Sequence, residues 1–448
     1  MAQVISLSDA ATLSNNLLVE GIIADIVTVD EWFKYLPFVV FEGLAYTFTR
    51  EKTLASADFA APGTNLNQSK YQAGATFESV NVNLAAIIAD IIIDGQIEDQ
   101  FSETNDQLQV QISAKAKQIA RIYMNAIINA RRSGGALSSS NNGPVGIEAK
   151  FDGMGSILDA ESGNVDDVNH PFYNGGQPTQ SEELKEDDPA SSRNGLPGRV
   201  FTLEDLDDLL DRVTGAKPDF LMMNAREIRT LRTLLRNTGG GTDSHMIQMQ
   251  GLGNEKPMLM YQDVPVFRND FVSKAEPVNT TELTVSSVTD SDTLELASDP
   301  ENDVGSGNAN YLLVRGEDDG VLYRYEIAGS SSGTTVDVSS VAGTFFDPEQ
   351  NRQVARRALN DSGLINAGST TAVVAERIDG SSIYCGAWGE LRGIVGFTSA
   401  NNAGLKLEYV GPREDENAYQ YRLKWYCGFD LYNRLSLARM KNVLGLGA

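Results

Sequence analysis

The side chains that most often do chemistry in proteins are scarce in this chain. Its 448 residues include two histidines, His170 and His245, and both lie in polar, loop-like sequence. Neither belongs to a Ser-His-Asp arrangement or to a metalloprotease helix, and two histidines do not supply a histidine-rich metal site. We therefore interpret both as surface residues.

The two cysteines, Cys385 and Cys427, stand among apolar residues in strand-like sequence. Two cysteines this far apart match neither a zinc motif nor a disulfide framework. We predict that both are buried and act as small hydrophobic side chains. A reducing, cytoplasmic compartment fits this use of cysteine.

Carboxylates and glycine-rich loops give no firmer sign of catalysis. Glu204 and Asp208 lie one helical turn apart on a face that we expect to be exposed, which gives acid–base catalysis little support. The acidic runs 299–304 and 317–320 lack EF-hand spacing, so we interpret them as solvated turns. The glycine runs 239–242 and 251–256 do not match a phosphate-binding loop. We predict no enzymatic activity, no cofactor and no metal.

Net charge limits the partners of the chain. The formal net charge is −25, and a surface this acidic repels phosphate backbones, which disfavours sequence-specific nucleic-acid binding. The apolar content of 41% is ordinary for a globular protein with a sizeable core. The longest apolar run, 84–93, is too short and too polar to span a bilayer. Residues 1–9 lack the pattern of a signal peptide. We expect no membrane role.

Two strands joined by a long polar stretch follow an aromatic cluster near the N-terminus. Residues 46–50 and 80–84 alternate apolar and polar side chains, which is the pattern of a half-buried strand. The stretch between them is rich in small and polar residues and contains a Pro62-Gly63 turn. This predicts an extended hairpin over 44–84. The aromatic cluster at 32–41 has too little local bulk to bury its rings, so it lies in the chain's own core or against a neighbour.

A long helix is expected after a buried strand at 87–93. Thr104 can cap this helix, and apolar side chains then recur at three- and four-residue spacing from Leu108 to Ala130. Arg131 and Arg132 suit its negative carboxyl end. The pattern predicts one helix over 104–132. Residues 134–200 are mostly linker-like.

Shorter elements follow the linker. Thr202 can cap a helix over 203–213 through a box closed by Asp205. Residues 218–223 predict a short buried strand, and Asn224 can cap the next helix, which ends before the glycines at 239–241. Residues 264–272 are strand-like, and residues 381–397 and 421–440 are dense in the residue types that build sheets and subunit contacts.

An acidic segment interrupts these later strands. Residues 275–347 contain 14 acidic residues and two arginines. Short strands near 282–287, 311–315 and 321–325 alternate with Asp/Gly turns. This predicts a small all-β module that faces solvent, inserted over 275–375.

The order of these elements resembles the major capsid protein of a tailed bacteriophage of the Hong Kong 97 type. Three phrases complete the likeness: Val264-Pro-Val-Phe-Arg-Asn-Asp270, Gly389-Glu-Leu-Arg-Gly-Ile-Val-Gly-Phe397 and Lys424-Trp-Tyr-Cys-Gly-Phe429. The resemblance covers most of the chain outside the insert and lies in element order more than in any one motif. It implies an α+β fold with these parts: N-terminal arm 1–43, extended hairpin loop 44–84, peripheral domain 85–200 with spine helix 104–132, axial/peripheral domain 201–274 and 376–448, and insertion domain 275–375.

The resemblance implies a structural role. The chain would be a major capsid subunit that self-assembles into the icosahedral head enclosing viral double-stranded DNA. Its partners would be many copies of itself in pentamers and hexamers, a separate scaffolding protein, a portal, and packaged DNA contacted non-specifically on the inner face. A decoration protein could bind the outer face. Such a protein is located in the virion and assembles in the host cytoplasm.

Candidate contacts between subunits follow from the same resemblance. They are Trp32 and Phe33 in the arm, Arg50, Lys52 and Lys70 in the extended loop, and Arg131 and Arg132 at the end of the spine helix. Some members of the family join subunits through a Lys–Asn isopeptide bond. Lys52 and Lys70 lie in the corresponding loop, but we interpret them as solvent-facing lysines.

Three other functions remain open at this point. An encapsulin-type nanocompartment shell shares the fold, and a groove for a cargo peptide would favour it. A β-rich surface-layer or adhesin protein fits the insert, but the long helix and the missing signal peptide disfavour it. A hydrolase rests on no specific feature.

Overall fold

The computed structural model describes most of the chain from residue 31 onward. The described residues are 31–43, 45–53, 55–60, 62, 71, 73–95, 107–132, 147–149, 151, 153–155, 157–158, 180–186, 196–213, 217–237, 246–247, 258–300, 310–318, 321–329, 331–347, 352–399, 405–413 and 416–446. The predictions made for Thr104, His170 and His245 fall outside these residues. No helix in the described ranges is long and apolar enough to cross a membrane.

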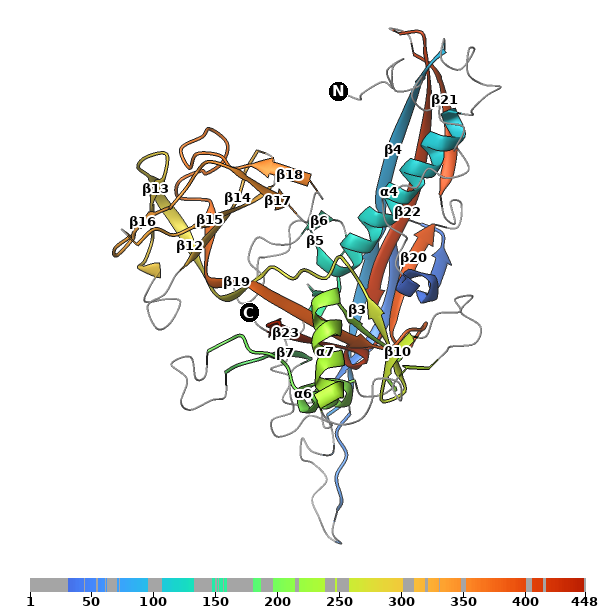
Figure 1. The fold of residues 1–448 in the computed structure, drawn as a ribbon. Helices are drawn as coiled ribbons and strands as arrows, with labels where there is room; N and C mark the ends of the chain where they lie inside the picture. Colours follow the sequence, from blue (N-terminus) through green and yellow to red (C-terminus); the bar gives the residue numbers. More distant parts are fainter. Residues whose placement is uncertain are drawn as a thin grey trace.

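One sheet is built around a long central strand, β22 (Ala418–Leu431). β4 (Ala85–Asp94) pairs with β22 along one edge, and β21 (Lys406–Pro412) and β20 (Ile394–Ser399) pair along the other. These pairs are antiparallel, and β1 (Phe38–Phe41) then adds to β20 in parallel. Helix α4 (Gln107–Asn129) lies along β4 and β22 and packs on their apolar side chains (Figure 1).

The long helix is shorter than the periodicity predicts. α4 ends at Asn129, and the predicted last turn is instead the short strand β5 (Ala130–Arg132), which pairs in parallel with β6 (Ile147–Ala149). The Gly153 N–H donates to the carbonyl oxygen of Ala130 at 2.8 Å. The prediction of helix up to residue 132 was therefore wrong, because backbone partners from later in the chain hold these residues in an extended conformation.

The second sheet carries helices on one face. Its part in the body runs in the order β7 (Ser181–Glu183), β23 (Leu437–Val443), β19 (Thr371–Gly386), β8 (Phe220–Met223), β11 (Val264–Arg268), β10 (Met258–Tyr261) and β9 (Met246–Ile247). Helices α6 (Leu203–Asp211) and α7 (Ala225–Asn237) pack their leucines against this sheet. The predicted helices and the buried strand before α7 are confirmed.

Both helix starts are fixed by the predicted side chains. Thr202 Oγ1 accepts the Asp205 N–H at 3.3 Å, and Asp205 Oδ2 accepts the Thr202 N–H at 2.7 Å. This is the reciprocal capping box that the sequence predicts. Asn224 Oδ1 accepts the Arg226 N–H at 2.7 Å and so begins α7.

β19 continues from the body into a separate β-module. Its first half pairs with β12 (Glu276–Val288) and β14 (Tyr311–Arg315), to which β13 (Thr293–Leu296), β15 (Leu322–Glu326) and β16 (Thr335–Asp337) add. β17 (Thr344–Asp347) and β18 (Arg352–Ala355) form a further pair. This module has its own cluster of buried Leu, Val and Tyr side chains, and it lies to one side of the body (Figure 1). The strands predicted near 282–287, 311–315 and 321–325 are confirmed.

The predicted hairpin also forms. β2 (Ala45–Thr53) and β3 (Thr76–Asn83) pair antiparallel, from Ala45 opposite Asn83 to Thr53 opposite Thr76. They form a two-stranded sheet that belongs to neither of the larger ones. Two 3-10 turns, Glu31–Tyr35 and Arg434–Ser436, complete the described elements.

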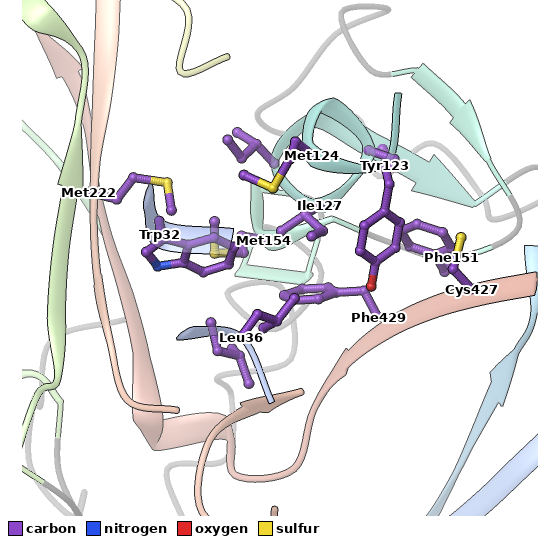
Figure 2. Packing of buried hydrophobic residues seen from close by; sticks show 14 of the residues in the cluster. Trp32, Leu36, Tyr123, Met124, Ile127, Phe151, Met154, Met222, Cys427 and Phe429 are labelled. Atoms are coloured by element: carbon purple, nitrogen blue, oxygen red, sulfur yellow. The ribbon is translucent and has the colours of Figure 1, made fainter. Parts of the chain in front are cut away.

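One core cluster joins the two sheets. Tyr123 of α4 is fully buried, and its hydroxyl donates to the carbonyl oxygen of Gly428 in β22 at 2.7 Å. Figure 2 shows the Tyr123 ring pointing from the helix toward Phe429. Trp32 of the N-terminal 3-10 turn and Met222 of β8 belong to the same cluster, so this turn and the helix-bearing sheet also pack on it. One buried cluster therefore packs against both sheets, and a second lies between the helix-bearing sheet and helices α6 and α7.

Candidate assembly interface

Trp32 lies in the core of its own chain. Its side chain is 0% exposed, and its ring centroid is 5.5 Å from that of Phe220 and 6.4 Å from that of Trp388. The prediction that Trp32 contacts a neighbouring subunit is therefore wrong. The 3-10 turn at 31–35 carries the indole inward, where it fills space between β8 and the loop that follows β19.

The structure says less about the other predicted contact residues. Phe33 is half-buried, and its ring centroid lies 5.9 Å from that of Phe38 and 6.0 Å from that of Tyr123, so much of its surface is covered within the chain. The remaining residues stay predictions: Arg50 and Lys52 lie on β2 and Arg131 and Arg132 on β5, with side chains that are not described, and Lys70 lies outside the described ranges.

The hairpin is anchored at its base, and two of its aromatic side chains farther out are exposed. At the base, the ring centroid of Phe48 lies 4.5 Å from that of Tyr432, and Val82 is buried. Farther out, Phe77 is 68% exposed and Phe59 is 99% exposed. An isolated two-stranded ribbon is at best marginally stable in water. We call Phe59 and Phe77 the hairpin surface, and it is an apolar surface without cover in the single chain.

Strand β21 is a second surface of this kind. Within the described residues β21 pairs only with β22, so its other edge has no strand beside it. Four apolar side chains on or next to this edge are each 43–55% exposed: Leu405, Leu407, Tyr409 and Val410. A long, apolar and exposed edge strand is a template for pairing with another chain. We call these four residues the β21 edge.

Ion pairs fix the register of the strands that carry this edge. Arg422 of β22 donates to both carboxylate oxygens of Asp90 in β4, at 2.6 and 3.2 Å. The hydrogen bond from Arg422 holds the pKa of Asp90 below its ordinary value. Lys424 forms an ion pair with Glu408 of β21. Pairs this exposed contribute little to stability, but they select one alignment of the strands.

A partly buried polar network anchors the β-module to the body. Ser382 Oγ donates to Glu276 Oε2 at 2.6 Å, and Arg439 Nε donates to Ser382 Oγ at 3.0 Å. Arg226, at the start of α7, donates to the backbone oxygen of Asp379 at 2.7 Å. These contacts join β12, β19, β23 and α7 at the point where β19 leaves the body. We call Glu276, Ser382, Arg439, Arg226 and Asp379 the junction network.

The described residues offer contact surfaces and little reaction chemistry. Among them, no group of three or more His, Cys, Asp and Glu side chains could hold a metal ion. Both cysteines are free and buried, as predicted, and burial raises the pKa of the Cys427 thiol to about 12. Glu204 and Asp208 are both exposed, as expected.

Comparisons with known proteins bear on the fold. No protein-family model matches the chain, and no curated protein matches its sequence. Among solved structures, the chain is similar to the encapsulin of Synechococcus elongatus PCC 7942 in the holo-SrpI encapsulin complex, with 13% identity, a TM-score of 0.50 and coverage of 99% of this chain and 97% of that one.

Two further structures align over almost the whole chain. The capsid of the native GTA particle has 11% identity, a TM-score of 0.44 and coverage of 98% of this chain and 100% of that one. A chain of Mycobacterium phage Adephagia has 8% identity, a TM-score of 0.43 and coverage of 97% of each chain. At the identity of the encapsulin, likeness shows the fold alone. The α+β class is therefore confirmed, and the chain has the fold of an encapsulin subunit.

Proposed function

We propose that this chain is a structural subunit of a closed protein shell, and more specifically the major capsid protein of a tailed bacteriophage of the Hong Kong 97 type. The observation that carries the proposal is the pair of uncovered apolar surfaces on a fold that an encapsulin shares. The hairpin surface and the β21 edge have no cover within the described chain, although a chain of this size has ample core to bury such residues elsewhere.

A shell supplies the missing cover. The hairpin of one subunit would lie on its neighbour, which removes Phe59 and Phe77 from water. The β21 edge would be covered by another copy, which satisfies its free backbone groups. Repetition of these contacts about five- and six-fold axes would close the shell into pentamers and hexamers, and many modest interfaces would sum to a strong container.

The acidic β-module suits the outer face of such a shell. Residues 275–347 carry 14 acidic residues against two arginines, and packaged DNA would lie on the opposite side. The boundaries of this insertion domain, the scaffolding protein, the portal and a decoration protein on the outer face belong to the same proposal.

Assembly of the purified chain tests the proposal. We expect closed particles by negative-stain electron microscopy for the wild type. The variant Phe59→Ser/Phe77→Ser should lose them, because it makes the hairpin surface polar. Leu446→Ser is the matched control, since Leu446 is 52% exposed but lies on neither surface. Only small monodisperse particles for the wild type, with every scaffold and salt condition tried, would contradict a shell.

An encapsulin-type nanocompartment is the second candidate. The similarity to the Synechococcus elongatus encapsulin over 99% of this chain favours it. The contents of particles isolated from the producing cell decide between the two. Nuclease-protected double-stranded DNA supports the capsid, whereas a stoichiometric protein cargo without DNA supports the nanocompartment.

A further inference from the structure

Helix α6 carries a row of acidic side chains on its exposed face. Its apolar side, with Leu206 and Leu209, is fully buried against the sheet. Its outer side presents Glu204, Asp208 and Asp211, all exposed. These positions have the spacing i, i+4 and i+7, so they lie along one line of the helix surface. We call them the acidic stripe.

Helix α7 carries the opposite charge in the same way. Its apolar side chains Leu231 and Leu235 are buried in the same cluster as those of α6. Its outer side presents Arg229, Arg232 and Arg236, all exposed, with the spacing i, i+3 and i+7. We call these three residues the basic stripe.

Neither stripe is neutralised within the described part of the chain. No ion pair or side-chain hydrogen bond joins any of the six side chains to a described residue. Other charges on the same helices do have partners: Asp205 binds Arg199 at 2.6 Å, and Arg226 binds Glu227 at 2.8 Å. Like charges one turn apart repel each other along a helix. Each stripe is therefore a surface that gains from an opposite charge on another molecule.

The two stripes match in length and in internal spacing. Each covers seven residue steps, which is about 10.5 Å at the rise of an α-helix. The acidic stripe has steps of four and then three residues, and the basic stripe has three and then four. Two such helices side by side therefore match only when they run antiparallel. That alignment brings the N-terminal Glu204 of α6 to the C-terminal Arg236 of α7, where both helix dipoles favour the pair.

We propose that the acidic stripe of one copy binds the basic stripe of the next copy in the same capsomer, with α6 and α7 antiparallel. The register that results pairs Glu204 with Arg236, Asp208 with Arg232 and Asp211 with Arg229. The inference rests on the proposed shell function and names one contact within it. Because the two halves of the contact lie on different helices, a copy can bind one neighbour through α6 and another through α7, and five- or six-fold rotation between copies would close these contacts into a ring.

Charge reversal tests the contact by its sign. The acid-reversed variant carries Glu204→Lys, Asp208→Lys and Asp211→Lys, and the base-reversed variant carries Arg229→Glu, Arg232→Glu and Arg236→Glu. Each variant should reduce the number of particles by a factor of roughly ten or more, because three like-charged pairs replace three oppositely charged ones. The swap variant, with all six changes, keeps the net charge of −25 and should recover particles. Raising salt to 1 M should weaken wild-type capsomers, because the Debye length falls to about 3 Å.

A mixture of the two reversed chains gives a sharper readout. Each reversed chain has two stripes of the same sign, so in the mixture every contact must join one chain of each kind. Alternation closes only rings with an even number of subunits. The mixture should therefore restore hexamers and not pentamers in native mass spectrometry.

Disulfide cross-linking tests the contact without reversing charge. A chain with Asp208→Cys and Arg232→Cys is assembled and oxidised with Cu(II)-phenanthroline. The native cysteines do not compete, because both are buried. We expect a ladder of covalent multimers up to the pentamer and hexamer on a non-reducing gel. The matched control, Asp208→Cys with Arg268→Cys, should stay monomeric because Arg268 is exposed on another element.

The outcomes separate this inference from the shell itself. Closed wild-type particles together with full assembly of both reversed variants would overturn the stripe contact and leave the shell standing. A cross-link limited to dimers would show a two-fold contact, which also overturns the head-to-tail ring. If the swap variant fails to fold by circular dichroism, the cysteine pair still decides. Absence of wild-type particles would refute the shell function first.

Discussion

Replacing Trp32 with alanine separates a core role from a contact role for this residue. The side chain is 0% exposed in the single chain, so the full area of the indole is removed from water on folding. An aromatic side chain of this kind buries about 150–250 Å², which at about 25 cal/mol per Å² corresponds to roughly 4–6 kcal/mol. Alanine retains a small part of this burial energy, and the variant contains a cavity where the indole ring was. We expect a loss of about 3–5 kcal/mol from the free energy of unfolding.

The phenylalanine variant refines this prediction. Within the described residues, the Nε1–H of Trp32 has no hydrogen-bond partner, and a buried donor in this state costs about 1–3 kcal/mol. Trp32→Phe removes that donor and keeps most of the apolar area. Removal of the unpaired donor offsets part of the lost packing. We therefore expect Trp32→Phe to lower the free energy of unfolding by less than half as much as Trp32→Ala.

Urea unfolding of the unassembled chain, followed by circular dichroism, measures both variants. Phe77→Ala is the control for a surface residue, since Phe77 is 68% exposed in the single chain and should lose less than about 0.5 kcal/mol. A Trp32→Ala variant as stable as the wild type when unassembled, but defective in assembly, would refute the core placement. It would restore Trp32 as a contact between subunits.

Three further predictions concern the interior. Burial would raise the pKa of Asp205, but hydrogen bonds from its arginine and threonine partners outweigh it and hold that pKa below its ordinary value of 3.8. The stabilisation from this carboxylate is thus fully present above pH 3.8 and is lost as pH falls through the lower folded pKa. Asp205→Asn should therefore lower the free energy of unfolding at pH 7. In urea unfolding at acid pH, the difference in that free energy between variant and wild type should disappear. Cys427, whose pKa burial raises to about 12, should react with a maleimide at pH 8 only after unfolding, and rapid labelling of the folded chain would contradict its burial. Gly396→Ala places a Cβ 2.6 Å from the Phe38 ring and should cost about 1–3 kcal/mol in urea unfolding, whereas Gly329→Ala, with nothing within 4 Å, should cost much less.

Local patterns predicted the elements whose causes are local. The capping box of Thr202 and Asp205 needs only residues three apart, and it forms as expected. Alternating apolar and polar side chains predict the two hairpin strands, and β2 and β3 pair over the predicted range. Cys427 was placed in the core by its apolar neighbours alone. In each case the information lies within a few residues of the element that it specifies.

The sequence failed where distant segments decide the structure. Arg131 and Arg132 match a helix end, but pairing with residues 147–149 makes them a strand. Trp32 has too few apolar side chains near it in sequence to bury its ring, and its cover comes from the distant Phe220 and Trp388. The six residues of the two stripes were visible as charges, yet their exposure and shared face depend on which side of each helix the sheet covers.

The junction network shows how the body of the chain holds the β-module in one alignment. Glu276 and Arg439 are 163 residues apart, and both meet Ser382 at the point where β19 leaves the body. Taking charges out of water is costly unless they are paired and hydrogen-bonded, so this arrangement holds only when β12, β19 and β23 meet in one alignment. Arg226 belongs to the same network and lies on α7, three residues before the basic stripe begins. β19 takes part in both sets of contacts: its Ser382 meets Glu276 of the module, and its Asp379 accepts from Arg226 in the first turn of α7, the helix that carries the basic stripe.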